Sequence, residues 1–130
     1  MKDISSAKKI ELIAKAVLEK KAKDVVLINL RKLSFICDWF IIASGDSTTQ
    51  ITAIADNIEE ELSIRKYKVY HREGRSGAIW ILLDYGDIVV HIFHKETRAF
   101  YNLEKLWHDA PLKKVNESTF LKKRVRRKRA

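Results

Sequence analysis

Apolar residues recur with a helical period in three stretches of the chain, and these stretches predict three helices. The first covers residues 6–21 and carries one apolar stripe, made of Ile10, Ile13, Ala14, Val17 and Leu18. The second covers 47–65 and begins at Ser47, three residues before Gln50. In that spacing each side chain satisfies a free backbone N–H of the first turn. The third covers 96–107 and ends before the only proline.

Short apolar runs between the helices predict five strands, at residues 24–30, 38–45, 67–74, 79–84 and 87–93. The last two runs are separated by a Tyr-Gly pair, which predicts a hairpin. The order is therefore helix, two strands, helix, three strands and helix. This order indicates an α/β or α+β domain with a mixed sheet of about five strands.

The predicted hairpin holds an unusual set of polar residues, in the stretch ILLDYGDIVVHIF at 81–93. A two-residue loop would pair Asp84 with Asp87 and Trp80 with His91. One face would then combine both acids with a mixed set: Trp80, Leu82, Val89, His91 and Phe93. The opposite face would be an aliphatic floor for helices, formed by Ile79, Ile81, Leu83, Ile88, Val90 and Ile92. Like charges directly opposite one another destabilise a strand pair, so the two acids invite a functional explanation.

One possible role for the two acids is catalytic. Together with His91, Asp84 and Asp87 offer ligands for a divalent metal, and the fold class suits a metal-dependent nucleotidyltransferase. Such an enzyme needs a phosphate-binding loop. The candidate loop, ASGDSTTQ at 43–50, has one glycine and no following lysine, so it does not match a P-loop. The pattern therefore disfavours catalysis.

The mixed face of the hairpin also suits packing, either against another protein or against the rest of the chain. An aromatic anchor with a charged rim is typical of protein interfaces, so the face is a candidate docking surface for a protein. The same residues equally suit the second side of a sheet that is covered on both faces. The pattern alone leaves these two possibilities open.

The formal net charge of +9 is concentrated at one end of the chain. Residues 113–130 contain nine Lys/Arg and one acid, whereas residues 1–112 contain 17 Lys/Arg and 16 Asp/Glu. We therefore expect a domain over 1–112 and a flexible basic tail over 113–130. The tail is either a solubilising segment or an RNA contact, with candidate contacts at Lys122, Lys123, Arg124, Arg126 and Arg127.

Composition excludes several classes of protein. The apolar runs are shorter than the ~20 residues that span a bilayer, and the first residues contain no apolar stretch of the kind found in secretory signals. The single cysteine, Cys37, can form neither an internal disulfide nor a thiolate metal cluster by itself. We expect a cytoplasmic protein.

Several of these segments together resemble one known family, the ribosomal silencing factors (RsfS, related to plant Iojap). The resemblance is carried by DWFIIASGDSTTQITAIAD, HREG, WILLDYGDIVVHIF and TRAFYNLEKLWHDAP, and it covers roughly residues 6–112. It implies a nucleotidyltransferase-like fold that lacks the catalytic acids of that superfamily, with no enzymatic activity, cofactor or metal. The basic end of the chain extends past the usual end of the family.

The resemblance also implies a partner and a surface. Family members bind the fourteenth protein of the large ribosomal subunit and block joining of the small subunit, and many are homodimers. Carried onto this chain, Trp80 would be an apolar anchor with Ile81 beside it, and Asp84 and Asp87 would be rim acids. The remaining surface residues would be His91, Phe93, Arg98 and Tyr101.

Overall fold

The computed structural model describes residues 2–117. In chain order the elements are α1 (Lys2–Glu19), β1 (Lys23–Asn29), β2 (Trp39–Gly45), α2 (Thr48–Ile64), β3 (His71–Glu73), β4 (Trp80–Asp84), β5 (Ile88–His94), α3 (Lys95–Tyr101), α4 (Leu103–Leu106) and β6 (Leu112–Val115). The strands form one mixed sheet in the order β3-β4-β5-β2-β1-β6. Only β2 and β5 pair in parallel, and the other neighbours in the described part of the sheet are antiparallel. The predicted class is confirmed, with six strands in place of about five.

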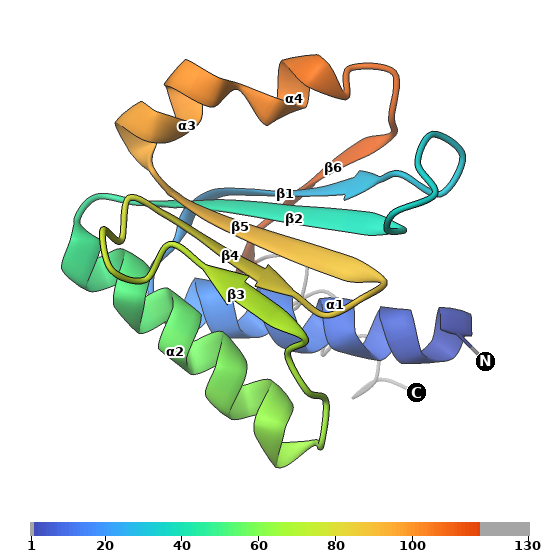
Figure 1. Ribbon diagram of the computed structural model, residues 1–130, viewed down its shortest axis with the longest axis horizontal. Coiled ribbons are helices and arrows are strands. Elements are labelled where there is room, and N and C mark those ends of the chain that lie inside the picture. Colours follow the sequence, from blue (N-terminus) through green and yellow to red (C-terminus); the bar gives the residue numbers. More distant parts are fainter. Residues whose placement is uncertain (1, 118–130) are drawn as a thin grey trace.

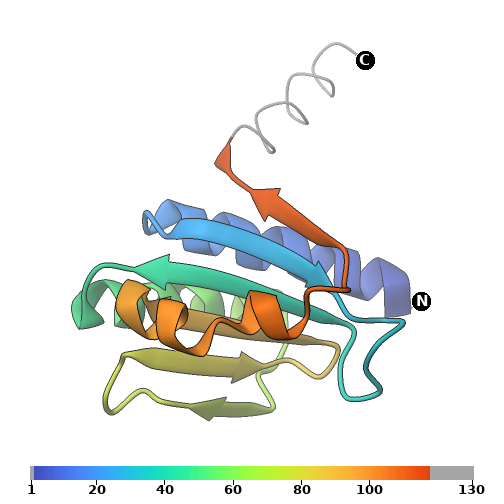
Figure 2. The same cartoon turned by 90° about the horizontal axis from the view of Figure 1, so that it is seen from above.

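Helices cover both faces of the sheet, but unequally. Figure 1 shows the long helices α1 and α2 on one face and the short helices α3 and α4 on the other. Seen from above in Figure 2, α3 and α4 lie over the middle of the sheet and leave β4 and β3 uncovered. One face is therefore closed, and part of the other face is open.

The closed face contains the larger core. The aliphatic floor predicted for the hairpin lies here and is buried against α1 and α2 at five positions, namely Ile81, Leu83, Ile88, Val90 and Ile92. The sixth residue, Ile79, is exposed because it precedes the first residue of β4. The second face has a smaller core in which Val26, Ile28, Ile42, Val89 and Phe93 pack beneath Leu103 and Trp107 of the α4 region.

The predicted start of α2 is confirmed. Ser47 is the N-cap, and its Oγ accepts a hydrogen bond from Gln50 N at 3.1 Å. The Gln50 side chain bonds differently from the expected capping box: its Oε1 accepts from Asp46 N, and its Nε2 donates to the carbonyls of Lys20 and Lys21. One amide thus satisfies groups at the beginning of α2 and directly after the end of α1.

Two predicted elements are shorter in the structure than the pattern indicated. The helix expected over 96–107 is divided at Asn102, which adopts the left-handed conformation with φ 46° and ψ 62°. Its side chain caps α4 by accepting a hydrogen bond from Lys105 N. The strand expected over 67–74 is reduced to the three exposed residues of β3.

The strand β6 was missed by the sequence pattern. Leu112–Val115 pairs antiparallel with β1, with Val115 opposite Val25 and Leu112 opposite Ile28. Two lysines in four residues suggested the beginning of a tail, although lysines are common on edge strands, where they discourage further pairing. The expected boundary between 112 and 113 therefore falls inside a strand. The RNA-contact candidates at 122–127 lie outside the described residues.

The register of the β4–β5 hairpin differs by two residues from the expected one. Trp80 pairs with Phe93 and Asp84 pairs with Val89, so Asp84 and Asp87 do not face each other. Gly86 and Asp87 therefore lie in the loop that joins the two strands. Gly86 has a φ of +91°, which glycine adopts without steric cost. A shift of two residues keeps the side chains within both strands on their predicted faces, because strands alternate with a period of two.

Gly74, immediately after β3, provides a test of how closely the chain there approaches β4. Its φ is +90°, and a Cβ atom there would lie 1.9 Å from the carbonyl oxygen of Trp80. We expect Gly74→Ala to lower the free energy of unfolding in urea by more than about 2 kcal/mol, because either β3 or β4 must move. Gly77→Ala is the matched control, since nothing lies within 4 Å of its Cβ position. Equal stability of the two variants would contradict the close approach.

Candidate docking surface

Aromatic rings gather on the partly open face, around Trp80. The Trp80 ring lies 4.7 Å from both Phe93 and Tyr101 between centroids, and 5.9 Å from His91. Phe40 of β2 packs against His91 at 4.5 Å, with the two rings edge to face. Aromatic pairs at these separations stabilise one another beyond the area that they bury. Trp80 is therefore held in place by neighbours from β5 and α3.

His91 lies at the bottom of this cluster. Trp80 Nε1 donates a hydrogen bond to His91 Nδ1 at 3.1 Å, and indole N–H is only a donor. His91 is therefore neutral, with its proton on Nε2, and that atom has no hydrogen-bond partner among the described residues. Burial lowers the pKa of His91 from its ordinary 6.5 to about 4. The His91 ring packs against Trp80, although the two residues are diagonal neighbours and not the directly opposed pair that was expected.

Several residues predicted for the partner surface are not accessible. His91 is 4% exposed, and Phe93 is fully buried beneath the same cover. Ile81 is also fully buried, but on the closed face, because it alternates with Trp80 along β4. The expectation that these three side chains are exposed on the surface was therefore wrong. His91 and Phe93 support Trp80 from below.

The accessible part of this face, which we call the docking face, is formed by β4, β3 and one residue of α3. On β4 the half-buried residues are Trp80, Leu82 and Asp84. Their neighbours are Glu73, which pairs with Leu82, and His71, which pairs with Asp84. Directly paired residues share a face, and Tyr101, 51% exposed, borders Trp80. The docking face thus combines an aromatic and aliphatic centre with two carboxylates, as protein interfaces do.

Asp87 does not belong to the docking face. Its carboxylate bonds to α1 on the closed side of the sheet, with Lys9 Nζ at 2.6 Å and Ser6 Oγ as donors. The side chain is only 13% exposed. Burial alone would raise the pKa of Asp87, but the bonds from Lys9 and Ser6 hold it below its ordinary value. The prediction of Asp87 as a rim acid was wrong, because the hairpin loop turns it toward α1.

Arg98 fixes the α3–α4 segment over the aromatic cluster. Its Nε and Nη2 donate to Glu104 at 3.0 and 2.7 Å, which joins the two helices across the break at Asn102. Its Nη1 donates to Ser44 Oγ and to the carbonyl of Asp24, which lies in the bulge of β1. The Arg98 side chain is only 11% exposed, so it holds the segment that carries Tyr101 and presents little surface of its own.

The geometry separates the groups that an enzyme would need. Asp84 lies on the docking face, whereas the Asp87 carboxylate is bonded on the opposite side of the sheet. The loop 43–50 follows β2, and both acids lie at the other end of the sheet, because β2 and β5 run in parallel and the hairpin turn precedes β5. Within residues 2–117 no three metal-ligating side chains gather.

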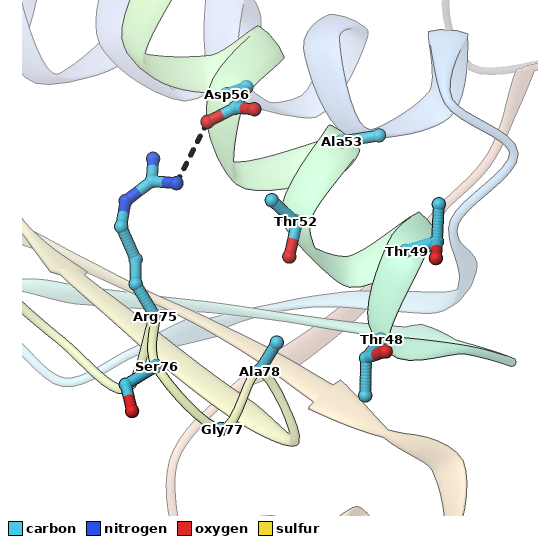
Figure 3. Close-up of a pocket in the computed structure, with 9 residues that line it drawn as sticks. All are labelled: Thr48, Thr49, Thr52, Ala53, Asp56, Arg75, Ser76, Gly77 and Ala78. Atoms are coloured by element: carbon cyan, nitrogen blue, oxygen red, sulfur yellow. Dashed lines mark hydrogen bonds and ion pairs between the residues drawn. The ribbon is translucent and has the colours of Figure 1, made fainter.

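A pocket of about 530 Å³ lies at the beginning of α2 (Figure 3), lined by Thr48, Thr49, Thr52, Ala53, Asp56, Arg75, Ser76, Gly77 and Ala78. Its two charged residues, Asp56 and Arg75, form an ion pair at 2.8 Å. Arg75 also bonds to Glu59, so its charge is already satisfied within the protein. The pocket therefore offers neither free cationic groups for a phosphate nor paired carboxylates for a metal.

Sequence reasoning missed His71 and Glu73 as members of the docking face. They come from HREG, a segment of the family resemblance, but only the observed pairing of β3 with β4 shows which side they occupy. Glu104 was also missed as the partner of Arg98. Its position directly after the apolar Leu103 gave no sign of an ion pair across a helix break.

Comparison with known proteins identifies close relatives. The chain matches the model of the family described as "Ribosomal silencing factor during starvation" over residues 3–130. It is 44% identical over 108 residues to the ribosomal silencing factor RsfS of Halalkalibacterium halodurans, covering 83% of this chain and 92% of that protein. A protein named mitochondrial assembly of ribosomal large subunit protein 1, from Mus musculus, is 30% identical over 75% of this chain and 44% of its own length.

The fold is also shared. The crystal structure of a protein from Chromobacterium violaceum superposes with a TM-score of 0.77 at 30% sequence identity, covering 78% of this chain and 85% of that one. No helix in the described part of the chain is long and apolar enough to cross a membrane.

His91 makes stability depend on pH. The unfolded chain takes up the His91 proton near pH 6.5, whereas the folded protein does so only near pH 4. Stability is therefore lost as the pH falls between these values, by roughly 3 kcal/mol. We expect His91→Gln, which does not titrate and keeps an acceptor for Trp80, to remove this part of the pH dependence in urea unfolding. An unchanged pH profile in the variant would assign the effect to other groups.

Proposed function

Because the chain belongs to the ribosomal silencing factor family, we propose that it represses translation by binding the large ribosomal subunit and blocking its association with the small subunit. The observation that carries the proposal is the incomplete cover of one sheet face, which leaves Trp80 and Leu82 accessible between Asp84, Glu73 and Tyr101. The named function of a 44% identical relative and the ribosomal name of the mouse relative support it.

The proposed mechanism is steric exclusion. The partner is the fourteenth protein of the large subunit, and the docking face binds it through the Trp80 centre. Asp84 and Glu73 form the acidic part of the rim, which suits the basic side chains that are abundant on ribosomal proteins. Such an interaction requires no bond-making chemistry, cofactor or metal. The protein acts in the cytoplasm and forms a homodimer.

The basic residues after 117 form a second proposed contact, with ribosomal RNA. Lys122, Lys123, Arg124, Arg126 and Arg127 belong to a segment, 118–130, that contains seven Lys/Arg and no acid. Binding of such a segment to phosphates releases counterions and is therefore weakened by salt. The RNA contact adds affinity but does not determine which partner is bound, because it does not depend on the shape of the docking face.

The docking face is tested by co-sedimentation with purified large subunits. We expect Trp80→Glu to weaken binding by tenfold or more, because a charge would replace the aromatic centre (about 1.4 kcal/mol or more). Asp84→Lys reverses a rim charge at a half-buried position and should also weaken binding. Its cost to folding is the loss of the hydrogen bond that Asp84 Oδ1 accepts from Gly86 N.

The matched control for these variants is Ile64→Glu, an exposed apolar residue at the end of α2 on the closed side. It should bind as the wild type does. Folding of each variant is checked by urea unfolding. Wild-type affinity in both folded Trp80→Glu and folded Asp84→Lys would reject the docking face, and failure of the wild type to sediment with large subunits would reject the function.

Removal of residues 118–130 tests the RNA contact while leaving β6 intact. We expect the truncated protein to bind large subunits more weakly at low salt and to lose less affinity as salt rises, since fewer phosphates are neutralised. The measurement is the slope of log affinity against log salt concentration for both proteins. Equal slopes would contradict an RNA contact by this segment.

A further inference from the structure

The connection between β1 and β2, residues 30–38, presents large apolar side chains to solvent. Phe35 is fully exposed and Ile36 is 90% exposed, and Leu33 is also exposed. Single apolar residues on a surface are ordinary, but two adjacent large ones at the tip of a loop form a patch of the kind that marks a binding site. No role for this segment followed from the sequence pattern.

The loop is held in a defined conformation by its own hydrogen bonds. Leu30 N donates to the Asp38 carbonyl at 2.8 Å and closes the base, while Leu33 N and Ser34 N donate back to the Leu30 carbonyl. Ile36 N donates to Ser34 Oγ at 3.1 Å. The two exposed side chains are therefore presented on an ordered tip, and a partner would bind them with little loss of backbone freedom.

The loop lies on the same side of the sheet as the docking face. Its ends, Leu30 and Cys37, are buried in the core beneath α3 and α4, and Figure 1 shows the connection rising on that side. Its base is joined to the β4–β5 turn, because Asp38 N and Trp39 N both donate to the Asp87 carbonyl, at 2.9 and 3.0 Å. That turn directly follows the end of β4 where Asp84 lies on the docking face.

We propose that Phe35 and Ile36 form a second anchor for the protein that occupies the docking face, by inserting into an apolar pocket on that partner. The inference rests on the proposed function, since it takes the partner to be a protein of the large subunit. Continuity of the loop base with the Asp84 end of β4 lets one partner surface reach both anchors. Trp80 and the loop tip would then fix the partner at two points and define its orientation.

The exposed Lys32 beside the tip also fits an anionic membrane surface, where basic and apolar residues bind together. The ordered conformation of the loop and its connection to the docking face favour the protein partner. The test therefore includes both targets.

The experiment compares four full-length proteins: wild type, Trp80→Glu, the double variant Phe35→Ser/Ile36→Ser, and the control Ile64→Ser. Each is titrated with purified large subunits and, separately, with vesicles made of phosphatidylglycerol and phosphatidylcholine. All four substituted positions are accessible to solvent. Urea unfolding is used to check that each variant folds. We expect the double variant to bind large subunits about tenfold more weakly than the wild type or Ile64→Ser.

The remaining outcomes separate the loop inference from the proposed function. If Trp80→Glu binds weakly and the double variant binds as the wild type, the loop inference is overturned and the proposed function stands. If the wild type does not bind large subunits, both are overturned. Loop-dependent binding to vesicles together with unchanged binding to large subunits would assign the tip to a membrane and overturn the inference.

Discussion

The parallel strand β5, which pairs with β2 at the centre of the sheet, is buried along six of its seven residues. A strand buried on both faces requires cover from two sides, and the chain supplies that cover unequally. The long helices α1 and α2 close one face, and the short α3–α4 segment covers only the middle of the other. The extent of that second cover decides which side chains of the hairpin reach solvent.

The difference between the closed and the partly open face explains why two aspartates three residues apart have unrelated roles. Asp84 ends β4 on the partly open face, and Asp87 belongs to the turn, where its carboxylate ties the hairpin to Lys9 of α1. The burial of Lys9 and Asp87 together, at 12% and 13% side-chain exposure, makes their ion pair part of the core boundary. A site in which Asp84 and Asp87 both contact one ligand would therefore require the β4–β5 turn to change its conformation.

The sequence alone predicted which residues share a face better than it predicted what covers them. Alternation placed Trp80, Leu82 and His91 together and Ile81 opposite, and these assignments survived a register error of two residues. Cover could not be predicted in the same way, because α3 and α4 contain no buried residue and are held by Arg98, Glu104 and a few aromatic contacts. Such contacts join segments that are distant in sequence, as with the Arg98 bond to Ser44. The missed β6 has a similar cause, since an edge strand with one half-buried residue leaves little periodicity to detect.

The position of β6 has a geometrical consequence for the basic end of the chain. In the sheet order β6 is four interstrand steps away from β4, a distance of roughly 19 Å at the usual spacing. The segment after residue 117 therefore starts at the far edge of the sheet from the docking face. A ligand that engages both is attached at two points that start on opposite sides of the sheet, and attachment through one contact raises the local concentration of the other. This separation would favour extended targets over small ones.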